Sequence, residues 1–335
     1  MSLPRVLIIS PALANANNGN WQTARRWRQM LKPAFQTTIA QSWDGTPFDV
    51  MLALHARRSA DSIAAWAKAR GATHSAPGLG VVLTGTDLYR DIQTDNSAQT
   101  SLAMARRLVV LQDRGPDALP QRLRHKVRVI FQSTSSRQTL AKTQRQVRAV
   151  MVGHLRDEKS PQTLFAAARL LNDHPDILID HIGEPLDAAL GEQARATALA
   201  CPHYRWLGGL AHETTRRRIQ RAHVLIHASR MEGGAHVVME AVCSGTPVLA
   251  SRIDGNVGML GANYPGYFEH GDAKGLVDLL QNFPAISHDL RAHCASRAPL
   301  FTPRAEQASL IQLVTDLLAG PALRPHRASG APTLD

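Results

Sequence analysis

Two glutamates eight positions apart, Glu232 and Glu240, lie in the segment of the chain that carries the most chemical information. The segment follows an apolar run ending at Ala228, passes through Gly233 and Gly234, and then takes on a helical pattern. A strand, a glycine-rich turn and a helix N-terminus together form an anion site, because free backbone N–H groups and the helix dipole both favour phosphate. Eight helical residues separate the two carboxylates by about 12 Å, which suits one extended ligand better than one metal ion.

A carboxylate at Glu240 is suited to the vicinal hydroxyls of a ribose, as an acidic residue is in dinucleotide sites. The alternative is that Glu232 caps a helix and Glu240 is solvated. The surrounding glycine frame favours the ligand-binding interpretation.

Polar and basic side chains follow three other predicted strands. Asn18-Gly-Asn20 opens a helix whose N-terminus can hold an anion, and Arg25 lies on that helix, unless the segment is an ordinary turn with a solvated basic helix. His55, Arg57 and Arg58 follow a second strand, and His55 is either a ligand contact or a satisfied buried histidine. Thr84-Gly-Thr-Asp87 follows a third strand, where Asp87 either meets the ligand or caps the next helix.

The charge of the chain predicts an anionic partner. Lys and Arg number 38 against 27 Asp and Glu, which gives a formal net charge of +11. Arginine binds phosphate oxygens in bidentate fashion, so phosphorylated small molecules are expected. No DNA- or RNA-binding motif is present, and we expect no nucleic-acid partner.

The elements that must position these groups alternate between short Val/Ile/Leu runs and helical segments, which predicts an α/β fold with parallel sheets. The chain of 335 residues suits two domains. Strands are expected at 5–10, 37–40, 50–55, 80–84, 107–111 and 127–131, and again at 148–152, 177–182, 204–207, 224–227 and 247–251. The polar, basic stretch 133–148 is the expected linker. Two doubly wound sheets then face a cleft, and ligands bind outside the carboxyl ends of their strands.

Several classes of protein are excluded by what the sequence lacks. Its three cysteines have no C-x-x-C spacing, and no apolar run approaches 18 residues, so we expect a soluble, cytoplasmic protein with no membrane partner. No D-x-D pair or H-E-x-x-H motif occurs, so no metal cofactor is expected. Hydride transfer is disfavoured because the first strand leads into Ala-Asn-Ala-Asn-Asn-Gly-Asn rather than G-x-G-x-x-G.

The segment Ser229–Ser251 resembles the E-x7-E signature of retaining, nucleotide-sugar-dependent glycosyltransferases with the two-Rossmann GT-B fold. Val152-Gly-His-Leu-Arg-Asp-Glu-Lys159 resembles the loop in which this superfamily neutralises the donor diphosphate with an arginine and a lysine. Lys159 matches the lysine. His154 stands where the family usually has arginine, which leaves His154 and Arg156 as candidates for that charge. Gly234-Ala235 replaces the usual Phe-Gly.

The chain up to about residue 318 is more narrowly similar to the selenosugar synthases of selenoneine biosynthesis. The matching segments are 18–27, 54–59, 83–90 and 153–159. This resemblance implies transfer of a sugar, typically N-acetylglucosamine from its UDP carrier, to the selenium of selenophosphate. Together with the linker, it leads us to expect domains at 1–145 for the acceptor and 146–303 for the donor, with a C-terminal helix at 304–319 packing back on the first domain. The stretch 320–335, rich in Pro, Ala and Arg without a period, is expected to be a mobile tail.

Three sets of site residues follow from these patterns and resemblances together. The predicted catalytic residues are Glu232, Arg156, Lys159 and His55. The predicted donor-binding residues are Arg156, Lys159, Gly233, Gly234, Ala235 and Glu240. The predicted acceptor-binding residues are Gly19, Asn20, Thr23, Arg25, Arg57, Thr84, Gly85, Thr86 and Asp87.

Two other functions stay open at this stage. One is an ordinary O-glycosyltransferase acting on a carbohydrate or phosphorylated acceptor, although few aromatic residues are available for a long saccharide site. The other is a binding module, either a nucleotide-sugar sensor or an RNA binder that uses the positive charge. Salt-dependent RNA affinity without sugar turnover would favour the binding module.

Overall fold

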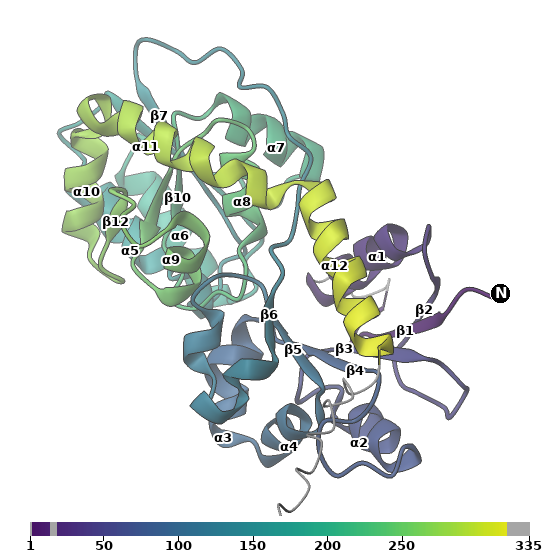
Figure 1. Cartoon of the computed structure of the whole chain (residues 1–335). Coiled ribbons are helices and arrows are strands. Elements are labelled where there is room, and N and C mark those ends of the chain that lie inside the picture. Colours follow the sequence, from purple (N-terminus) through teal and green to yellow (C-terminus); the bar gives the residue numbers. More distant parts are fainter. Residues whose placement is uncertain (1, 14–18, 320–335) are drawn as a thin grey trace, which may run out of the picture.

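Two parallel six-stranded sheets form the framework of the protein (Figure 1). The structure is a computed structural model that describes residues 2–13 and 19–319. Each sheet is built only from parallel pairs, so each strand must be followed by a crossover segment, usually a helix. The predicted α/β class with two Rossmann-like domains is confirmed.

The first sheet has the strand order β2-β1-β3-β4-β5-β6. Its strands are β1 (Arg5–Ile9), β2 (Gln36–Ala40), β3 (Val50–Leu54), β4 (Leu79–Val82), β5 (Arg107–Val110) and β6 (Val127–Val129). The helices of this domain are α1 (Gly19–Leu31), α2 (Ala60–Ala69), α3 (Ile92–Thr94) and α4 (Asn96–Met104), with a π-helical turn at Asp87–Asp91.

Both faces of this sheet are buried, because alternate side chains of each strand point to opposite faces. Val6 and Ile8 pack in one cluster with Trp27 of α1, whereas Leu7 and Ile9 pack in another with Trp66 of α2. The apolar run of β1 therefore packs against helices on both faces of the sheet.

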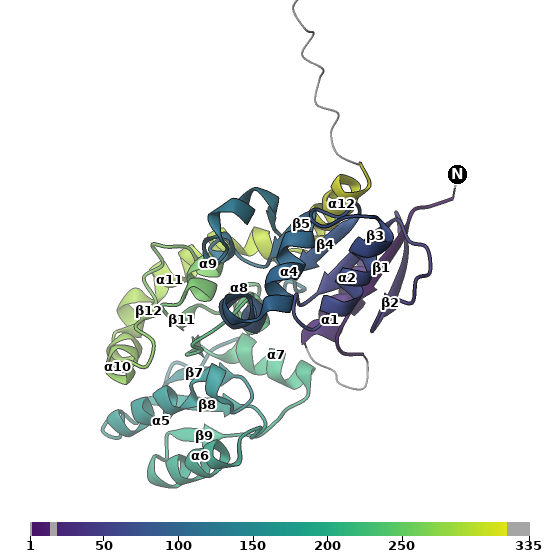
Figure 2. The same cartoon turned by 90° about the horizontal axis from the view of Figure 1, so that it is seen from below.

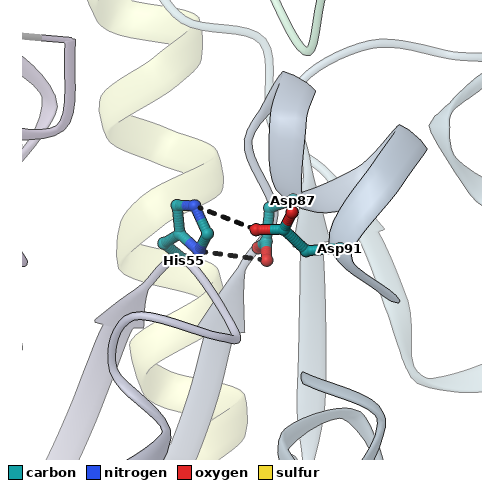
Figure 3. A group of neighbouring side chains, drawn as sticks. All are labelled: His55, Asp87 and Asp91. Atoms are coloured by element: carbon teal, nitrogen blue, oxygen red, sulfur yellow. Dashed lines mark ion pairs between the residues drawn. The ribbon is translucent and has the colours of Figure 1, made fainter. Parts of the chain in front are cut away.

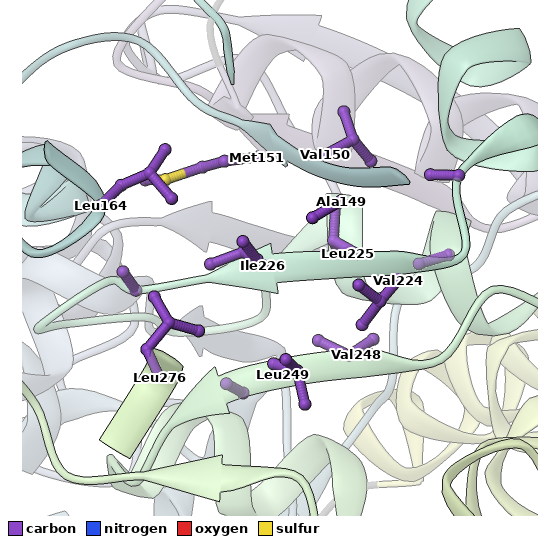
Figure 4. Close-up of a cluster of buried hydrophobic side chains, with 14 of the residues drawn as sticks. Ala149, Val150, Met151, Leu164, Val224, Leu225, Ile226, Val248, Leu249 and Leu276 are labelled. Carbon is purple, nitrogen blue, oxygen red and sulfur yellow. The ribbon is translucent and has the colours of Figure 1, made fainter. Parts of the chain in front are cut away.

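The second sheet has the strand order β12-β11-β10-β7-β8-β9. Its strands are β7 (Val147–Val152), β8 (Ile177–Ile182), β9 (Tyr204–Trp206), β10 (Val224–His227), β11 (Val248–Ser251) and β12 (Tyr267–Phe268). The helices are α5 (Pro161–Leu170), α6 (Ala188–Ala200), α7 (His212–Arg221), α8 (His236–Val242), α9 (Asp254–Leu260), α10 (Ala273–Gln281) and α11 (Phe283–Arg297). Figure 4 shows the central strands contributing Val150, Ile226 and Leu249 to one buried cluster.

The chain passes between the domains twice, near Gln132 and again after α11. The last described helix, α12 (Pro303–Leu318), returns to the first domain and lies beside α1 (Figures 1 and 2). Its Leu310, Val314 and Leu317 complete the cluster that contains Val6 and Ile8. The core of the first domain is thus closed by residues from the other end of the chain.

Two predicted features, Asn18 and the tail 320–335, lie outside the described residues. Within the described part, no helix combines the length and the apolar character that crossing a lipid bilayer requires.

Candidate active site

The carboxyl ends of strands from both sheets surround one pocket with a cavity volume of about 280 Å³. The first domain contributes Gly19, Asn20, Thr23, His55, Arg58, Thr84, Gly85, Thr86, Leu111 and Gln132. The second domain contributes Arg156, Glu158, Met231, Glu232, Gly233 and Gly234. Most of the predicted site residues therefore come together, although they lie more than 200 positions apart in the chain. We call the two sides the acceptor half (first domain) and the donor half (second domain), after the roles that the sequence analysis expects of them.

The two halves meet most closely at Gly85 and Gly233. A Cβ built on Gly85 would lie 2.7 Å from the backbone nitrogen of Gly233, and one built on Gly233 would lie 2.4 Å from that of Gly85. Both distances are shorter than non-bonded atoms tolerate, so neither position can take a side chain without moving backbone. Glycine is required at both positions because it lets these two segments of the chain approach so closely.

Glu232 is held by two basic groups in the donor half. Its Oε1 lies 2.5 Å from Nζ of Lys159 and 3.4 Å from Nε2 of His227, which is the last residue of β10. Burial alone would raise the pKa of Glu232, but the Lys159 ammonium and the hydrogen bond from His227 outweigh it and hold the pKa well below its usual value. The carboxylate is ionised at neutral pH, and Lys159 is its counter-ion.

Glu240 lies on α8, away from the wall of the pocket. Its Oε1 is 2.7 Å from Nε2 of His212 and 3.6 Å from Nη1 of the buried Arg216. Ala235, the residue before α8, also does not line the pocket. Glu240, the predicted ribose contact, is therefore nearly buried outside the pocket wall, with its carboxylate against the exposed side chain of His212.

Arg156, and not His154, lines the pocket. The Arg156 guanidinium is half exposed, and its Nε lies 3.9 Å from Oε2 of Glu158. His154 is exposed, and its Nδ1 accepts a hydrogen bond from the backbone of Glu184. Of the two residues that the sequence left as alternatives, Arg156 lies in the pocket and His154 does not.

The N-terminus of α1 forms one wall of the acceptor half, with Gly19, Asn20 and Thr23. The Thr23 hydroxyl accepts a hydrogen bond of 2.7 Å from the side chain of Gln132, which follows β6. Arg25 is exposed and does not line the pocket, because it points from another face of α1.

His55 lines the pocket in a left-handed backbone conformation, with φ 76°. Its Nδ1 lies 3.1 Å from Oδ1 of Asp87, and its Nε2 lies 3.7 Å from Oδ2 of Asp91 (Figure 3). The other Asp87 oxygen accepts the N–H of Ala56 at 2.8 Å. Asp87 is fully buried behind His55, so it neither caps the helix that follows nor reaches the pocket.

The adjacent Arg57 and Arg58 have different environments. Arg57 Nε donates to Oδ2 of Asp91 at 2.8 Å and does not line the pocket. Arg58 lines the pocket, and no carboxylate of the described residues lies within ion-pair distance of its guanidinium. Arg58 therefore takes the place in the pocket that was expected of Arg57.

His55, Asp87 and Asp91 are also the group of described residues best placed to hold a metal, since one ligand atom from each lies within 4.8 Å of the others. Asp91 is also paired with Arg57 and Arg90, and Asp87 accepts the backbone N–H of Ala56. Both carboxylates therefore have protein partners of their own, and together they fix the orientation of the imidazole.

Sequence reasoning missed several residues of the site, among them Gln132, Leu111, His227 and Arg216. Gln132 and Leu111 follow predicted strands, and that position could have identified them. His227 lies only five positions before Glu232, but its place at the end of the apolar run 224–227 gave it the pattern of a buried strand residue. No local pattern marks Arg216, whose partner Glu240 lies on another helix.

The chain belongs to the glycosyl transferases of group 1, whose family model matches residues 132–300. The matched segment covers the linker and almost the whole second domain, including every residue of the donor half. A comparison with curated proteins found no match.

Solved structures share the fold at low sequence identity. Sucrose-phosphate synthase from Thermosynechococcus elongatus has a TM-score of 0.72 at 17% identity, over 95% of this chain and 100% of that one. HepE from Anabaena, in complex with UDP and glucose, has a TM-score of 0.68 at 13% identity, over 94% and 99%. A mutant of S. aureus TarM, in complex with fondaparinux, alpha-GlcNAc-glycerol and UDP, has 0.59 at 13%, over 81% of this chain. The chain spans only 55% of the length of TarM.

Proposed function

We propose that the protein transfers a sugar, N-acetylglucosamine being the first candidate, from a UDP-sugar to the selenium of selenophosphate. Family membership supports the sugar transfer, and the complexes of HepE and TarM with UDP support a UDP-linked donor. The observation that supports an anionic acceptor is the Arg58 guanidinium, which has no carboxylate partner among the described residues and lies in a small, polar pocket beside the N-terminus of α1. Such a wall suits a compact anion, because it offers a cation and backbone N–H groups.

The reaction joins selenium to the anomeric carbon, while the carbon–oxygen bond to UDP breaks and its electron pair leaves with the diphosphate. Selenophosphate is already ionised at neutral pH, so the site needs no strong base to activate it. The protein supplies position and charge instead. Arg156, Lys159 and the amides of Gly233 and Gly234 face the leaving diphosphate, and no metal is assigned to that role.

Glu232 is the group proposed to hold the sugar ring. It is ionised and fixed by Lys159 and His227, so it can accept hydrogen bonds from sugar hydroxyls without reorganising. Glu240 is the proposed ribose contact, and His55, held by Asp87 and Asp91, lies beside the acceptor. Retention of the anomeric configuration is proposed only from the resemblance to the E-x7-E enzymes.

The second candidate is an O-glycosyltransferase that uses the same donor with a small phosphorylated or carbohydrate acceptor. The same cationic wall favours a phosphorylated acceptor within this class. The two candidates share the donor half and differ only in the nucleophile.

Anaerobic incubation with UDP-N-acetylglucosamine, with and without selenophosphate, tests the proposal. UDP release and selenium-containing products are followed by mass spectrometry. The phosphoryl group stays on selenium when the carbon–selenium bond forms, and its transfer to water then releases phosphate and leaves the selenosugar. The expected result is therefore selenophosphate-dependent UDP release together with the mass of the Se-phosphorylated sugar or of the selenosugar itself. Donor binding with no effect of selenophosphate would reject this acceptor and leave the O-glycosyltransferase, which phosphorylated alcohols then test.

A further inference from the structure

Glu306, on α12, is a buried carboxylate that joins three segments of the chain. Its two oxygens accept hydrogen bonds from Nε of Arg26 at 3.1 and 3.2 Å and from Nε1 of Trp27 at 2.7 Å. They also accept the backbone N–H of Ser133 at 2.8 Å and its hydroxyl at 2.5 Å. The Glu306 carboxylate thus joins α12 to α1 and to Ser133, which lies where the chain first passes between the domains.

Arg26 extends this network into the second domain. Its Nη1 lies 3.0 Å from Nε2 of His236, the first residue of α8. A guanidinium can only donate, so Nε2 of His236 must accept and the ring must be neutral. Burial first, and then the positive charges of Arg26, His212 and Arg216, lower the pKa of His236 to about 3, which agrees with a neutral ring.

Both ends of the Arg26 bridge lie next to the pocket. Thr23, on α1, and Gln132, next to Ser133, line the acceptor half and hydrogen-bond to each other. On the other side, His236 comes two residues after Gly234, which lines the donor half. A change in the Arg26 bridge therefore changes the separation of the two halves.

We propose that Arg26 is a positioning residue for glycosyl transfer, which holds the acceptor half in register with the donor half by bridging Glu306 and His236. This inference rests on the proposed function only in placing the reaction in this pocket. Arg26 touches no reacting atom, and its effect passes through α1, Ser133 and α8. A misplacement of about 1 Å at the reacting groups can cost on the order of 100-fold in rate.

Kinetics of Arg26→Gln test the proposal, with Arg28→Gln as the matched control, since Arg28 is exposed on the same helix. We expect kcat of Arg26→Gln to fall about 10- to 100-fold, with the dissociation constant of UDP, measured by calorimetry, unchanged. Donor hydrolysis without acceptor serves as a second rate, so the test does not require selenophosphate. A kcat equal to that of Arg28→Gln would overturn the proposal.

Variants of His236 separate positioning from simple destabilisation. His236→Gln keeps an oxygen that can accept from Arg26, so we expect near wild-type kcat, whereas His236→Leu should lower kcat toward the value of Arg26→Gln. The double variant Arg26→Gln/His236→Leu should be no worse than Arg26→Gln, because Arg26→Gln already lacks the contact that His236→Leu removes. Fully additive losses in kcat would overturn the bridge.

Hydrogen exchange without any ligand keeps this inference independent of the substrate. We expect faster amide exchange at 131–136 and at the start of α8 in Arg26→Gln than in Arg28→Gln. Unchanged exchange in both segments would overturn the bridge even in an enzyme that makes the selenosugar. Faster exchange in a protein that does not use selenophosphate would support the bridge and reject only that acceptor.

Discussion

The two halves of the pocket hold charge in different ways. In the donor half Lys159 and His227 hold Glu232, and Glu158 approaches Arg156. In the acceptor half Arg58 lines the pocket and has no carboxylate partner among the described residues, whereas its neighbour Arg57, outside the pocket, is paired with Asp91. The donor half presents charges that are already compensated, and the acceptor half presents a positive charge that, under the proposed function, meets the incoming anion.

This contrast shows that net charge alone does not locate a binding site. The formal charge of +11 is spread over the whole chain, and most of the arginines near the pocket already have acidic partners. Arg58 indicates the binding site better than the net charge does, because no neighbouring carboxylate balances its charge. An anion that binds there forms a charge-assisted hydrogen bond without breaking an existing ion pair.

Replacing Glu232 by Gln tests the donor half most severely. We expect kcat to fall on the order of 100- to 1,000-fold, because a neutral amide removes the fixed charge facing the reacting sugar. Glu158→Gln is the matched control, since that carboxylate lines the same pocket and only approaches Arg156 at 3.9 Å. Steady-state kinetics of both variants with UDP-N-acetylglucosamine measure the difference. Equal losses would mean that Glu232 has no special role.

Gly85→Ala tests the contact between the halves. The new methyl group would meet the backbone of Gly233 at 2.7 Å, so the halves must separate, and kcat should fall by about 100-fold. Affinity for UDP, measured by calorimetry, should change little because the donor half is left intact. A variant with unchanged kcat would show that the halves do not need this approach during turnover.

Arg58→Gln and Arg57→Gln test the uncompensated charge directly. We expect Arg58→Gln to raise the KM for the anionic acceptor by about 10-fold, the value of one lost charge-assisted contact. Arg57→Gln should leave that KM near the wild-type value and lower the free energy of unfolding by about 1 kcal/mol or less, because its pair with Asp91 is partly exposed. The reverse order of KM values would assign the acceptor to Arg57.

The smallest expected effect is a pH dependence of stability from His236. Its folded pKa, about 3, lies below the ordinary value of 6.5, so between these values the unfolded chain binds a proton that the folded chain does not. The free energy of unfolding should therefore decrease as the pH falls below 6.5, by at most about 1.4 kcal/mol per pH unit. Urea unfolding at pH 7 and pH 5 measures it, and His236→Gln should lose less stability than wild type over that interval.

The sequence predicted the fold and the donor half better than the acceptor half, and the reason is local. The central strands of both sheets are apolar runs, and the loop from Met231 to Gly234 lies between β10 and α8, a strand, turn and helix that are consecutive in the chain. The acceptor half is assembled from α1 and from loops that follow separate strands, so its members are brought together only by the order of the sheet.

Which of two neighbouring residues lies in the pocket also depends on tertiary contacts. Arg57 and Arg58 have the same side chain and adjacent positions, and only the location of Asp91 distinguishes them. Asp87 was expected at the ligand, but the backbone of Ala56 and the ring of His55 bind it from behind. Such partners lie more than 30 positions away and leave no local pattern.

Helix α12 has a consequence for how the protein is made. Val6 and Ile8 share their buried cluster with Trp27 of α1 and with Leu310, Val314 and Leu317 of α12. During synthesis the N-terminal half therefore leaves the ribosome with this face of its sheet only partly covered, by α1, and the cluster is complete only when residues 303–318 have also emerged. The half that is translated first thus completes its core with a helix that is translated after the whole second domain.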